Sequence, residues 1–353
     1  MPVTDLTRTD IKNLSYDALK TYLATIGEPG FRVDQIFEYL YHQETTAFAE
    51  MTRLPRALRQ RLAKDFCLDG LEEEGRFCSQ DKTVKLLFRL RDRQIVETVL
   101  IPTASRVTLC VSTQVGCKFG CRFCASGLGG WVRNLSPAEI VGQVLRGRRE
   151  AKRQGRSLSN IVFMGIGEPL DNYEALLRAI GVMNHPRAMG IGARRMTIST
   201  CGVAPRILRL SQEGIQVELA VSLHGYDQAS RGALMPVSRK YPFDELMAAC
   251  REYSRRTRRR VTFEYILIER FTCRPEAAQG LARAFEGILC QVNLIPYNPV
   301  REFTYRRPGA RDISAFQEAL DREGIAWTMR RPRGQDVGAA CGQLRRQQQG
   351  ECL

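Results

Sequence analysis

The 353-residue sequence contains no apolar run long enough to cross a bilayer, and its N-terminus lacks the hydrophobic region of a signal peptide. These absences predict a cytoplasmic protein with no membrane partner. Thiols stay reduced in the cytoplasm. We therefore expect the 12 cysteines to be ligands, reactive groups or small buried residues, and not a disulfide framework.

Acidic residues are in the minority, since 38 Asp and Glu stand against 53 Lys and Arg, which leaves a net charge of +15. This balance suits a polyanionic partner, and nucleic acid is the leading candidate. A compositional bias towards arginine would produce the same excess. The basic residues gather in three runs: Arg146, Arg148, Arg149, Lys152, Arg153 and Arg156; Arg255, Arg256, Arg258, Arg259 and Arg260; and Arg330, Arg331, Arg333, Arg345 and Arg346.

Residues 1–75 have apolar side chains at helical spacing, and we interpret them as an N-terminal helical domain. One helix is expected to start at Ser15, which suits an N-cap, and others to cover 31–41 and 55–66. Four arginines alternate with the apolar residues of the third segment. The domain is either an RNA-binding accessory or a packing domain.

Residues 76–105 change to the period of strands. Two β-branched segments within 83–101, separated by the charged residues 91–93, predict a β-hairpin that forms a small β extension. Glu97 lies inside the second segment, among Val and Ile. It is either a functional carboxylate or an outward-facing edge residue.

Residues 106–353 alternate between strand and helix patterns, which predicts an α/β fold with a parallel sheet. No Gly-x-Gly-x-x-Gly turn follows the first strand, so a partial (β/α)6 barrel is favoured over a dinucleotide-binding fold. The helix at 136–154 has a clear start, because Ser136, Pro137 and Glu139 form a capping box with proline at N1. Strands are expected at 106–113, 160–164, 195–199, 217–223, 261–268, 291–296 and 326–330, and the other helices at 171–184, 203–213, 242–257, 275–286 and 312–323.

Polar residues follow these strands where a β/α barrel carries its chemistry, at the carboxyl ends. They are Gly167, Glu168, Ser199, Thr200, Ser222, His224 and Asn298. On the first strand Val107, Leu109 and Val111 share one face, while Thr108, Cys110 and Ser112 share the face towards the lumen. Cys110 is thus a candidate for the cavity, or else a buried structural cysteine.

Cys117, Cys121 and Cys124 stand at C-x3-C-x2-C spacing. A closed structural zinc site normally takes four ligands. Three thiolates can hold a [4Fe–4S] cluster with one iron left to bind another molecule. We therefore predict a [4Fe–4S] cluster, and the spacing resembles that of the radical S-adenosylmethionine (SAM) enzymes, which implies that the free iron binds SAM; a zinc knuckle or three unrelated thiols are the alternatives. A glycine-rich segment at 334–344, which contains Cys341, follows the last strand and is expected to reach the barrel mouth.

Together these motifs resemble the RlmN/Cfr family of radical SAM RNA methyltransferases over nearly the whole chain. The resemblance rests on Cys117-Lys-Phe-Gly-Cys-Arg-Phe-Cys-Ala-Ser-Gly, Arg133-Asn-Leu, Met164-Gly-Ile-Gly-Glu-Pro, Ser222-Leu-His, Asn293-Leu-Ile-Pro-Tyr-Asn-Pro and Ala339-Ala-Cys-Gly-Gln-Leu. The pair Glu168-Pro169 is nearer to RlmN, and the stretch around 117–130 is nearer to Cfr. Taken together, the motifs favour RlmN.

The resemblance implies methylation of carbon 2 of adenosine 2503 in 23S rRNA, and of adenosine 37 in certain tRNAs; a Cfr-type enzyme would methylate carbon 8 instead. It implies two SAM molecules per turnover, one that methylates Cys341 and one that yields a radical through the cluster. The activated methyl adds to RNA, Glu97 matches the base, and Cys110 resolves the adduct as a disulfide. Positions matching SAM contacts are Gly167, Glu168, Ser199, Ser222, Leu223, His224 and Asn298.

The chain departs from the family pattern at two places. Ile166 replaces a methionine, which is neutral if that side chain only packs, and residues 269–275 replace a Val-Asn-Asp stretch. The expected partners are 23S rRNA, tRNA and a flavodoxin-like electron donor, and the protein is expected to be a monomer. The competing hypotheses are a radical SAM enzyme acting on a peptide or small molecule and a zinc-containing RNA-binding protein.

Overall fold

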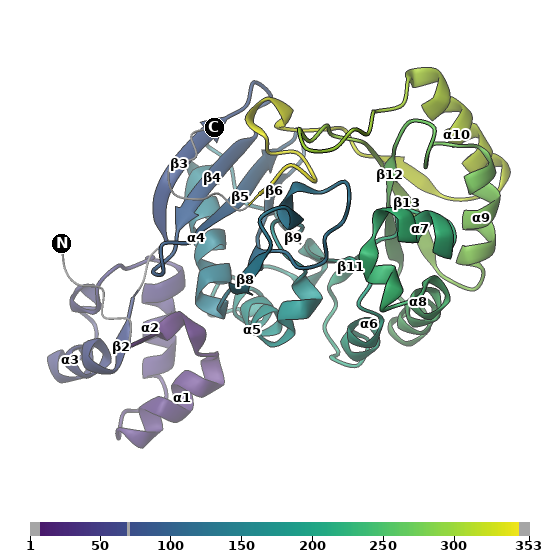
Figure 1. The fold of residues 1–353 in the computed structure, drawn as a ribbon. Helices are drawn as coiled ribbons and strands as arrows, with labels where there is room; N and C mark the ends of the chain where they lie inside the picture. The colour runs from purple at the N-terminus through teal and green to yellow at the C-terminus, as the bar shows by residue number, and fades with distance from the viewer. Residues whose placement is uncertain (1–7, 69–70, 346–353) are drawn as a thin grey trace.

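The structure, a computed structural model, describes residues 8–68 and 71–345, so Arg346 and Cys352 lie outside the described residues. One ten-stranded sheet runs through most of the molecule, with the strand order β14-β13-β12-β11-β10-β9-β6-β5-β4-β3. Figure 1 shows the sheet curving with its helices on the outer side and the N-terminal helices set below β3 to β5. The fold is the radical SAM α/β type that the sequence predicts.

Seven parallel strands form the partial barrel: β6 (Val107–Cys110), β9 (Asn160–Phe163), β10 (Met196–Thr200), β11 (Glu218–Ser222), β12 (Val261–Leu267), β13 (Cys290–Pro296) and β14 (Trp327–Met329). The crossover helices are α4 (Pro137–Arg153), α5 (Tyr173–Asn184), α6 (Ala204–Leu210), α8 (Phe243–Thr257), α9 (Glu276–Phe285) and α10 (Ala310–Arg322). Each overlaps its predicted segment, and the capping box at Ser136 is present. The short α7 (Gln228–Leu234), which follows β11, was not predicted.

The expected hairpin is β4 (Val84–Arg89) with β5 (Ile95–Pro102), and β5 continues antiparallel onto β6. A third strand, β3 (Glu72–Cys78), pairs with β4 and forms the edge of the sheet. The sequence expectation of helix through residue 75 is therefore wrong from Glu72 onward. The three glutamates of this strand obscure a strand pattern, and they are tolerated because the edge strand is largely exposed.

The N-terminal helices are α1 (Tyr16–Thr25), α2 (Arg32–Tyr41) and α3 (Arg56–Asp65), close to the predicted segments. The short strands β1 (Thr9–Asp10) and β2 (Phe66–Cys67) pair in parallel at the two ends of this unit. Glu44 after α2 binds Arg148 and Arg149 of α4. Part of the first basic run therefore fastens the N-terminal helices to the barrel.

The remaining elements are short. A separate antiparallel pair joins β7 (Gln114–Gly116) to β8 (Trp131–Asn134), and it encloses the cysteine motif. The 3-10 turns are Ile11–Asn13, Phe48–Glu50, Ala125–Gly127, Pro169–Asn172, Ala193–Arg195, Pro236–Arg239 and Gln335–Val337. Within the described ranges no helix is both long and apolar enough to span a membrane.

The core between sheet and helices decides which face of the first barrel strand points inward. Val107, Leu109 and Val111 are buried in the main apolar core. A Cβ placed on Gly147 of α4 would come within 2.4 Å of the Leu109 side chain, so this helix requires glycine to pack so close to the strand. Thr108 and Cys110, on the other face, line an internal cavity as predicted, whereas Ser112, predicted with them, lines neither cavity because its hydroxyl bonds to the Glu97 carbonyl and the Ile166 amide.

Candidate active site

The three motif cysteines lie in the loop between β7 and β8 and line one cavity of about 150 Å³. The other walls come from residues at the carboxyl ends of the parallel strands, among them Met164 after β9 and Ser222 at the end of β11. Parallel strands end at the same edge of a sheet, so residues distant in sequence meet there. The cavity is therefore where the strand-end prediction puts the chemistry.

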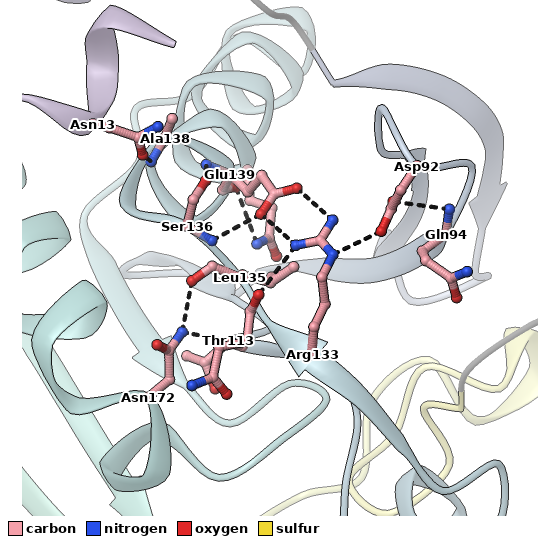
Figure 2. Close-up of polar contacts among 12 residues, drawn as sticks. Asn13, Asp92, Gln94, Thr113, Arg133, Leu135, Ser136, Ala138, Glu139 and Asn172 are labelled. Carbon is pink, nitrogen blue, oxygen red and sulfur yellow. Dashed lines mark hydrogen bonds and ion pairs between the residues drawn. The ribbon is translucent and has the colours of Figure 1, made fainter. Parts of the chain in front are cut away.

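The cysteine loop is held at its base by a network of polar contacts (Figure 2). The Cys117 amide donates to the Gly130 carbonyl at 3.0 Å, which closes the loop. Arg133 of β8 forms ion pairs with Asp92 of the β4–β5 turn at 2.7 Å and with Glu139 of α4 at 2.8 Å. Asn172 donates to the carbonyls of Thr113 and Leu135 on either side of the loop. The loop is thus fixed to three separate elements.

The arrangement of the three thiols fits an iron–sulfur cluster. Burial raises the pKa of Cys117 to about 12, and the pKa values of Cys121 and Cys124 are also raised by burial and by neighbouring thiols. Bound cations offset that cost because they hold coordinating thiols deprotonated. In the ranges that the structure describes, no three His, Cys, Asp or Glu side chains are grouped to hold a single metal ion. Three thiols in one cavity wall suit a multi-iron centre better than one zinc.

Five of the seven predicted SAM-binding residues line this cavity: Gly167, Glu168, Ser199, Ser222 and His224. Leu223 and Asn298 do not line it. The Leu223 side chain is buried in the core, and its carbonyl accepts a hydrogen bond from Arg231. The Asn298 side chain is turned to the C-terminal loop (residues 334–345), where its amide donates to the Cys341 carbonyl at 3.0 Å.

Glu168 is anchored and mostly buried. Its two carboxylate oxygens accept the amides of Leu170 at 2.9 Å and Cys201 at 2.6 Å, and burial raises its pKa. The preceding Gly167 has φ +104°, and a Cβ there would lie 2.6 Å from Gln114 Cβ. Only glycine fits that turn. The carboxylate is therefore preorganised beside the motif cysteines.

His224 lines the cavity and is also held in place by the surrounding fold. Its Nδ1 accepts the Ile266 amide at 3.0 Å, and its ring meets Phe123 edge-on with centroids 4.7 Å apart. Burial lowers the pKa of His224 to about 3, so the ring is neutral at pH 7 and Nε2 carries the proton. That nitrogen can act as a hydrogen-bond donor in the cavity.

A second cavity of about 720 Å³ adjoins the first and contains the other two predicted catalytic sulfurs. Cys341 lines both cavities, and Cys110 lines only the larger one. Cys110 also packs in a small apolar cluster with Ala339 and Leu344, which flank Cys341 in the C-terminal loop. Burial, and then the charge of Cys341, raise the pKa of Cys110 to about 12. The fold therefore brings the two cysteines to one place.

The C-terminal loop is fastened directly to the cysteine loop. The Gly342 carbonyl accepts the Ala125 amide at 2.7 Å, and the Leu344 carbonyl accepts the Ser126 hydroxyl at 2.7 Å. On its other side the loop meets the β3–β4 turn, where Asp336 accepts the Ser79 hydroxyl at 2.6 Å. These contacts hold Cys341 at the boundary of the two cavities.

Glu97 is buried, so its interpretation as an outward-facing edge residue is wrong: β5 lies between β4 and β6 and is no edge. Its carboxylate lies 3.5 Å from Lys85 of β4 and accepts the Arg345 amide at 3.1 Å. Burial raises the pKa of Glu97, and Lys85 opposes that shift. Glu97 lines neither cavity, because the C-terminal loop covers it in this conformation.

Comparison with known proteins agrees with this geometry. Residues 111–273 match the Radical SAM superfamily, and residues 9–68 match the ribosomal RNA large subunit methyltransferase N-terminal domain. A protein of Geobacillus kaustophilus named "Probable dual-specificity RNA methyltransferase RlmN" is 45% identical over 97% of this chain and 93% of its own length. One of the same name from Symbiobacterium thermophilum is 46% identical over 98% and 93%. This chain belongs to the RlmN family of radical SAM RNA methyltransferases.

A solved structure supports the RlmN-family assignment. A radical SAM methyltransferase from Sphaerobacter thermophilus is 45% identical and superposes with a TM-score of 0.91, over 95% of this chain and 98% of the other. The protein is therefore an enzyme, a radical SAM RNA methyltransferase. Enzymes of the radical SAM superfamily use SAM and a [4Fe–4S] cluster, and the cavity described above suits both.

The two departures from the RlmN/Cfr pattern lie outside the chemistry. Ile166 is buried in the apolar cluster beside Cys110, so this side chain packs, as the neutral interpretation requires. Residues 269–275 line neither cavity. Within this stretch Thr272 accepts the Ile268 amide through its hydroxyl, which closes a local turn. The replaced stretch therefore leaves both cavity walls intact.

Several cavity residues of this RlmN-family chain escaped the sequence analysis. Arg330 was grouped with the basic runs, yet its side chain lines both cavities. Cys201 was given no role although it lines the smaller cavity. Glu264 lies in the middle of β12 and lines both cavities. Lys85 lines neither cavity, but it was missed as the buried partner of Glu97. The positions of Cys201 and Arg330, each directly after a strand, were signals that could have identified these two residues.

Proposed function

We propose that this enzyme methylates carbon 2 of adenosine 2503 in 23S rRNA, and of adenosine 37 in tRNAs, through a methyl group carried on Cys341. The observation that carries the proposal is the position of Cys341. It lines the cavity that contains the three motif cysteines and also the cavity that contains Cys110. The name of the relatives, which includes "dual-specificity", supports two classes of RNA substrate.

Residues of the smaller cavity would bind the cofactors. Cys117, Cys121 and Cys124 would ligate a [4Fe–4S] cluster, and Gly167, Glu168, Ser199, Ser222 and His224 would contact SAM. When bound, these two groups supply the electron and the radical that activate a methyl group. Adenine carbon 2 lies between two ring nitrogens and is too electron-poor to attack SAM directly. This is why a radical route suits the substrate.

Cys341 and Cys110 of the larger cavity, with the buried Glu97 near the C-terminal loop, would carry the methyl group and release the product. The Cys341 sulfur takes a methyl group from one SAM by displacement. After the activated methyl has bonded to the base, Glu97 takes the proton from carbon 2. Cys110 then attacks the Cys341 sulfur, a disulfide forms, and the methylated RNA leaves. The C-terminal loop must shift for Glu97 to meet the base, because Arg345 now covers that carboxylate.

RNA binding would involve the N-terminal helices (residues 8–68), the β extension (72–105) and the barrel (106–345). The net charge of +15 favours a polyanion, although many arginines are already paired with carboxylates. In the second basic run, for example, Arg255 and Arg256 bind Glu252 and Arg259 binds Glu218. An external electron donor of the flavodoxin type and a monomeric state complete the proposal. RNA affinity should fall steeply as salt rises.

The test is mass spectrometry of nucleosides from unmodified 23S rRNA and tRNA after incubation with reconstituted enzyme, SAM and a reductant. We expect 2-methyladenosine from both RNAs. Finding 8-methyladenosine instead would show Cfr-type regiochemistry, and finding no methylated adenosine would contradict the proposal. The Cys341→Ala variant, with its cluster intact, serves as the matched negative control.

A further inference from the structure

Arg330 stands directly after β14, where the two cavities meet. Only a few residues line both cavities: Met164, Glu264, Ile295, Arg330 and Cys341. The Arg330 amide donates to the Leu294 carbonyl of β13 at 2.8 Å, which fixes its backbone to the sheet. Its Nη1 contacts Met164 Sδ at 3.5 Å. The guanidinium is thus directed inward, unlike the surface arginines of the same basic run.

The charges around the guanidinium are those of the two catalytic sulfurs and one carboxylate. Arg330 and Cys341 both line both cavities, and Cys110 lines the larger one with them. The charge of Cys341, followed by those of Glu264 and Cys110, raises the pKa of Arg330 above its usual value. A guanidinium is always charged in proteins. It therefore places a permanent positive charge beside both sulfurs.

Glu264 is the carboxylate that lines both cavities together with Arg330. It is buried, its Oε2 accepts the Asn293 amide at 2.8 Å, and its carbonyl accepts the Leu223 amide at 3.0 Å. Burial raises the pKa of Glu264, and Arg330 opposes that shift. Because Glu264 is held by two neighbouring strands, it can keep the guanidinium in place whichever form the sulfurs take.

We propose that Arg330 is a positioning residue, whose guanidinium supplies the countercharge for the anionic form of the Cys341 sulfur at the boundary of the two cavities. The proposal rests on the function proposed above. In the loading step the Cys341 thiolate, its proton already lost to solvent, bonds to the methyl carbon of SAM. The bond from that carbon to the sulfonium sulfur breaks and leaves S-adenosylhomocysteine. The product is a neutral thioether, so the Glu264 carboxylate then balances the Arg330 charge.

The same guanidinium serves the release step. The Cys110 thiolate bonds to the Cys341 sulfur, and the bond from that sulfur to the transferred carbon breaks. The electron pair of the broken bond stays on the transferred carbon, which takes a proton from solvent to complete the methyl group, so the two sulfurs are oxidised and the carbon is reduced. Arg330 faces Cys110 as well as Cys341, and its charge therefore favours the attacking thiolate.

The test measures methyl loading of Cys341 by peptide mass spectrometry in reconstituted enzyme given SAM without a reductant. Because a nearby opposite charge favours the ionised thiol, we expect Arg330→Met to slow loading by roughly tenfold or more. Arg330→Lys should recover part of the rate. The matched control is Arg322→Met, which makes the same change on an exposed arginine of α10. Loading at the wild-type rate in Arg330→Met, with normal cluster absorbance, would overturn the proposal.

Two further measurements distinguish the role of Arg330 from the proposed function and from an effect of the substitution on stability. The rate of Cys341 alkylation by iodoacetamide, without SAM, should fall in Arg330→Met and recover in Arg330→Lys. If wild-type enzyme never loads methyl but alkylation still depends on Arg330, the proposed function fails and the role of Arg330 stands. The double variant Arg330→Met/Glu264→Gln removes the unpaired carboxylate and should regain thermal stability but not loading. Recovery of loading in the double variant would overturn the proposal.

Discussion

The site has two sides that are assembled in different ways. The cluster side consists of Cys117, Cys121, Cys124, Gly167, Glu168, Ser199, Ser222 and His224. The sulfur side consists of Glu97, Cys110, Arg330 and Cys341. The first is built from a closed loop and from strand ends of a single parallel sheet. The second depends on the C-terminal loop, which meets the antiparallel extension more than 200 residues away in sequence.

This difference separates the part of the site that would bind the cofactors from the part that would carry the methyl group. The residues of the cluster side are held mainly by contacts within the barrel and at the base of the cysteine loop, and Asp92 and the C-terminal loop add further contacts. The sulfur side adds a movable methyl carrier, which is held by a few hydrogen bonds between loops. We therefore expect that changes on the sulfur side stop methyl transfer while the cluster persists, and that changes on the cluster side remove both.

The largest expected effect comes from the methyl carrier itself. Cys341→Ala should abolish RNA methylation, because no sulfur remains to carry the methyl group, while the absorption near ~400 nm of the cluster is kept. The variant with Cys117, Cys121 and Cys124 all changed to Ala should lose both. Residual RNA methylation by Cys341→Ala would remove the distinction between the two sides.

Cys110→Ala should stop the reaction one step later. Without the resolving thiol the covalent link between Cys341 and RNA cannot be broken, so a protein–RNA adduct should accumulate on denaturing gels. Cys250→Ala is a suitable control, since Cys250 is buried in the main core away from both cavities. Free methylated RNA at the normal yield, with no adduct, would show that Cys110 has no such role.

Lys85→Met should destabilise the sulfur side, because it removes the cation 3.5 Å from the buried Glu97 carboxylate. Removing one partner of a buried pair typically costs roughly 3–5 kcal/mol. Chemical denaturation of the reconstituted protein would measure this loss. The double variant Lys85→Met/Glu97→Gln should regain most of the stability but no methyl transfer. An unchanged denaturation midpoint in Lys85→Met would contradict the pairing.

Asp336→Ala should loosen the C-terminal loop by removing its hydrogen bonds to Ser79 and Gln80 in the β3–β4 turn. Hydrogen–deuterium exchange should rise across 334–345 and stay constant across 117–130, with a few-fold slower methyl transfer. The hydrogen bond from Ser79 lowers the pKa of Asp336. The contact should therefore weaken as pH falls below the usual aspartate range. Equal exchange in both loops would show that the turn does not hold the C-terminal loop.

The smallest effect is expected at the base of the cysteine loop. Asp92→Asn removes one of the two carboxylates on Arg133, and a partly exposed ion pair contributes less than about 1 kcal/mol. Burial would raise the pKa of Asp92, but Arg133 outweighs it and the pKa is lowered. The stability contributed by this ion pair is thus present above the unfolded pKa of aspartate and lost as pH falls. The free energy of unfolding should differ less between pH 7 and pH 3 in Asp92→Asn than in wild type.

The cluster side could be predicted from the sequence because its signals are local. The Cys117 motif is a short spacing, and Glu168, Ser199 and Ser222 come at or directly after strand patterns. Asn298 shows the limit of that rule, because it follows a strand but turns to the Cys341 carbonyl. The end of a strand places a residue at the edge of the sheet, but the direction of its side chain depends on contacts with the neighbouring loop.

Strand alternation directed Cys110 towards the lumen, and the glycine-rich segment placed Cys341 near the barrel mouth, but the roles of the sulfur side could be predicted only through family resemblance. No local pattern relates Cys110 to Cys341, or Glu97 to Arg345, because these contacts form between distant segments. Lys85 and Arg330 were missed for the same reason. A lysine in a strand and an arginine in a basic run are most simply expected in solvent, and only the tertiary structure gives them buried partners.

The most direct test of methyl transfer through Cys341 is an isotope transfer experiment. Reconstituted enzyme is first given SAM with a trideuterated methyl group but no reductant, so that only Cys341 is labelled, and free SAM is removed. Unlabelled SAM, reductant and rRNA are then added to start one turnover. The mass of the methylated adenosine is measured by mass spectrometry. We predict a methyl group that retains deuterium from Cys341. An unlabelled methyl group in the first turnover would show that the carrier is not Cys341.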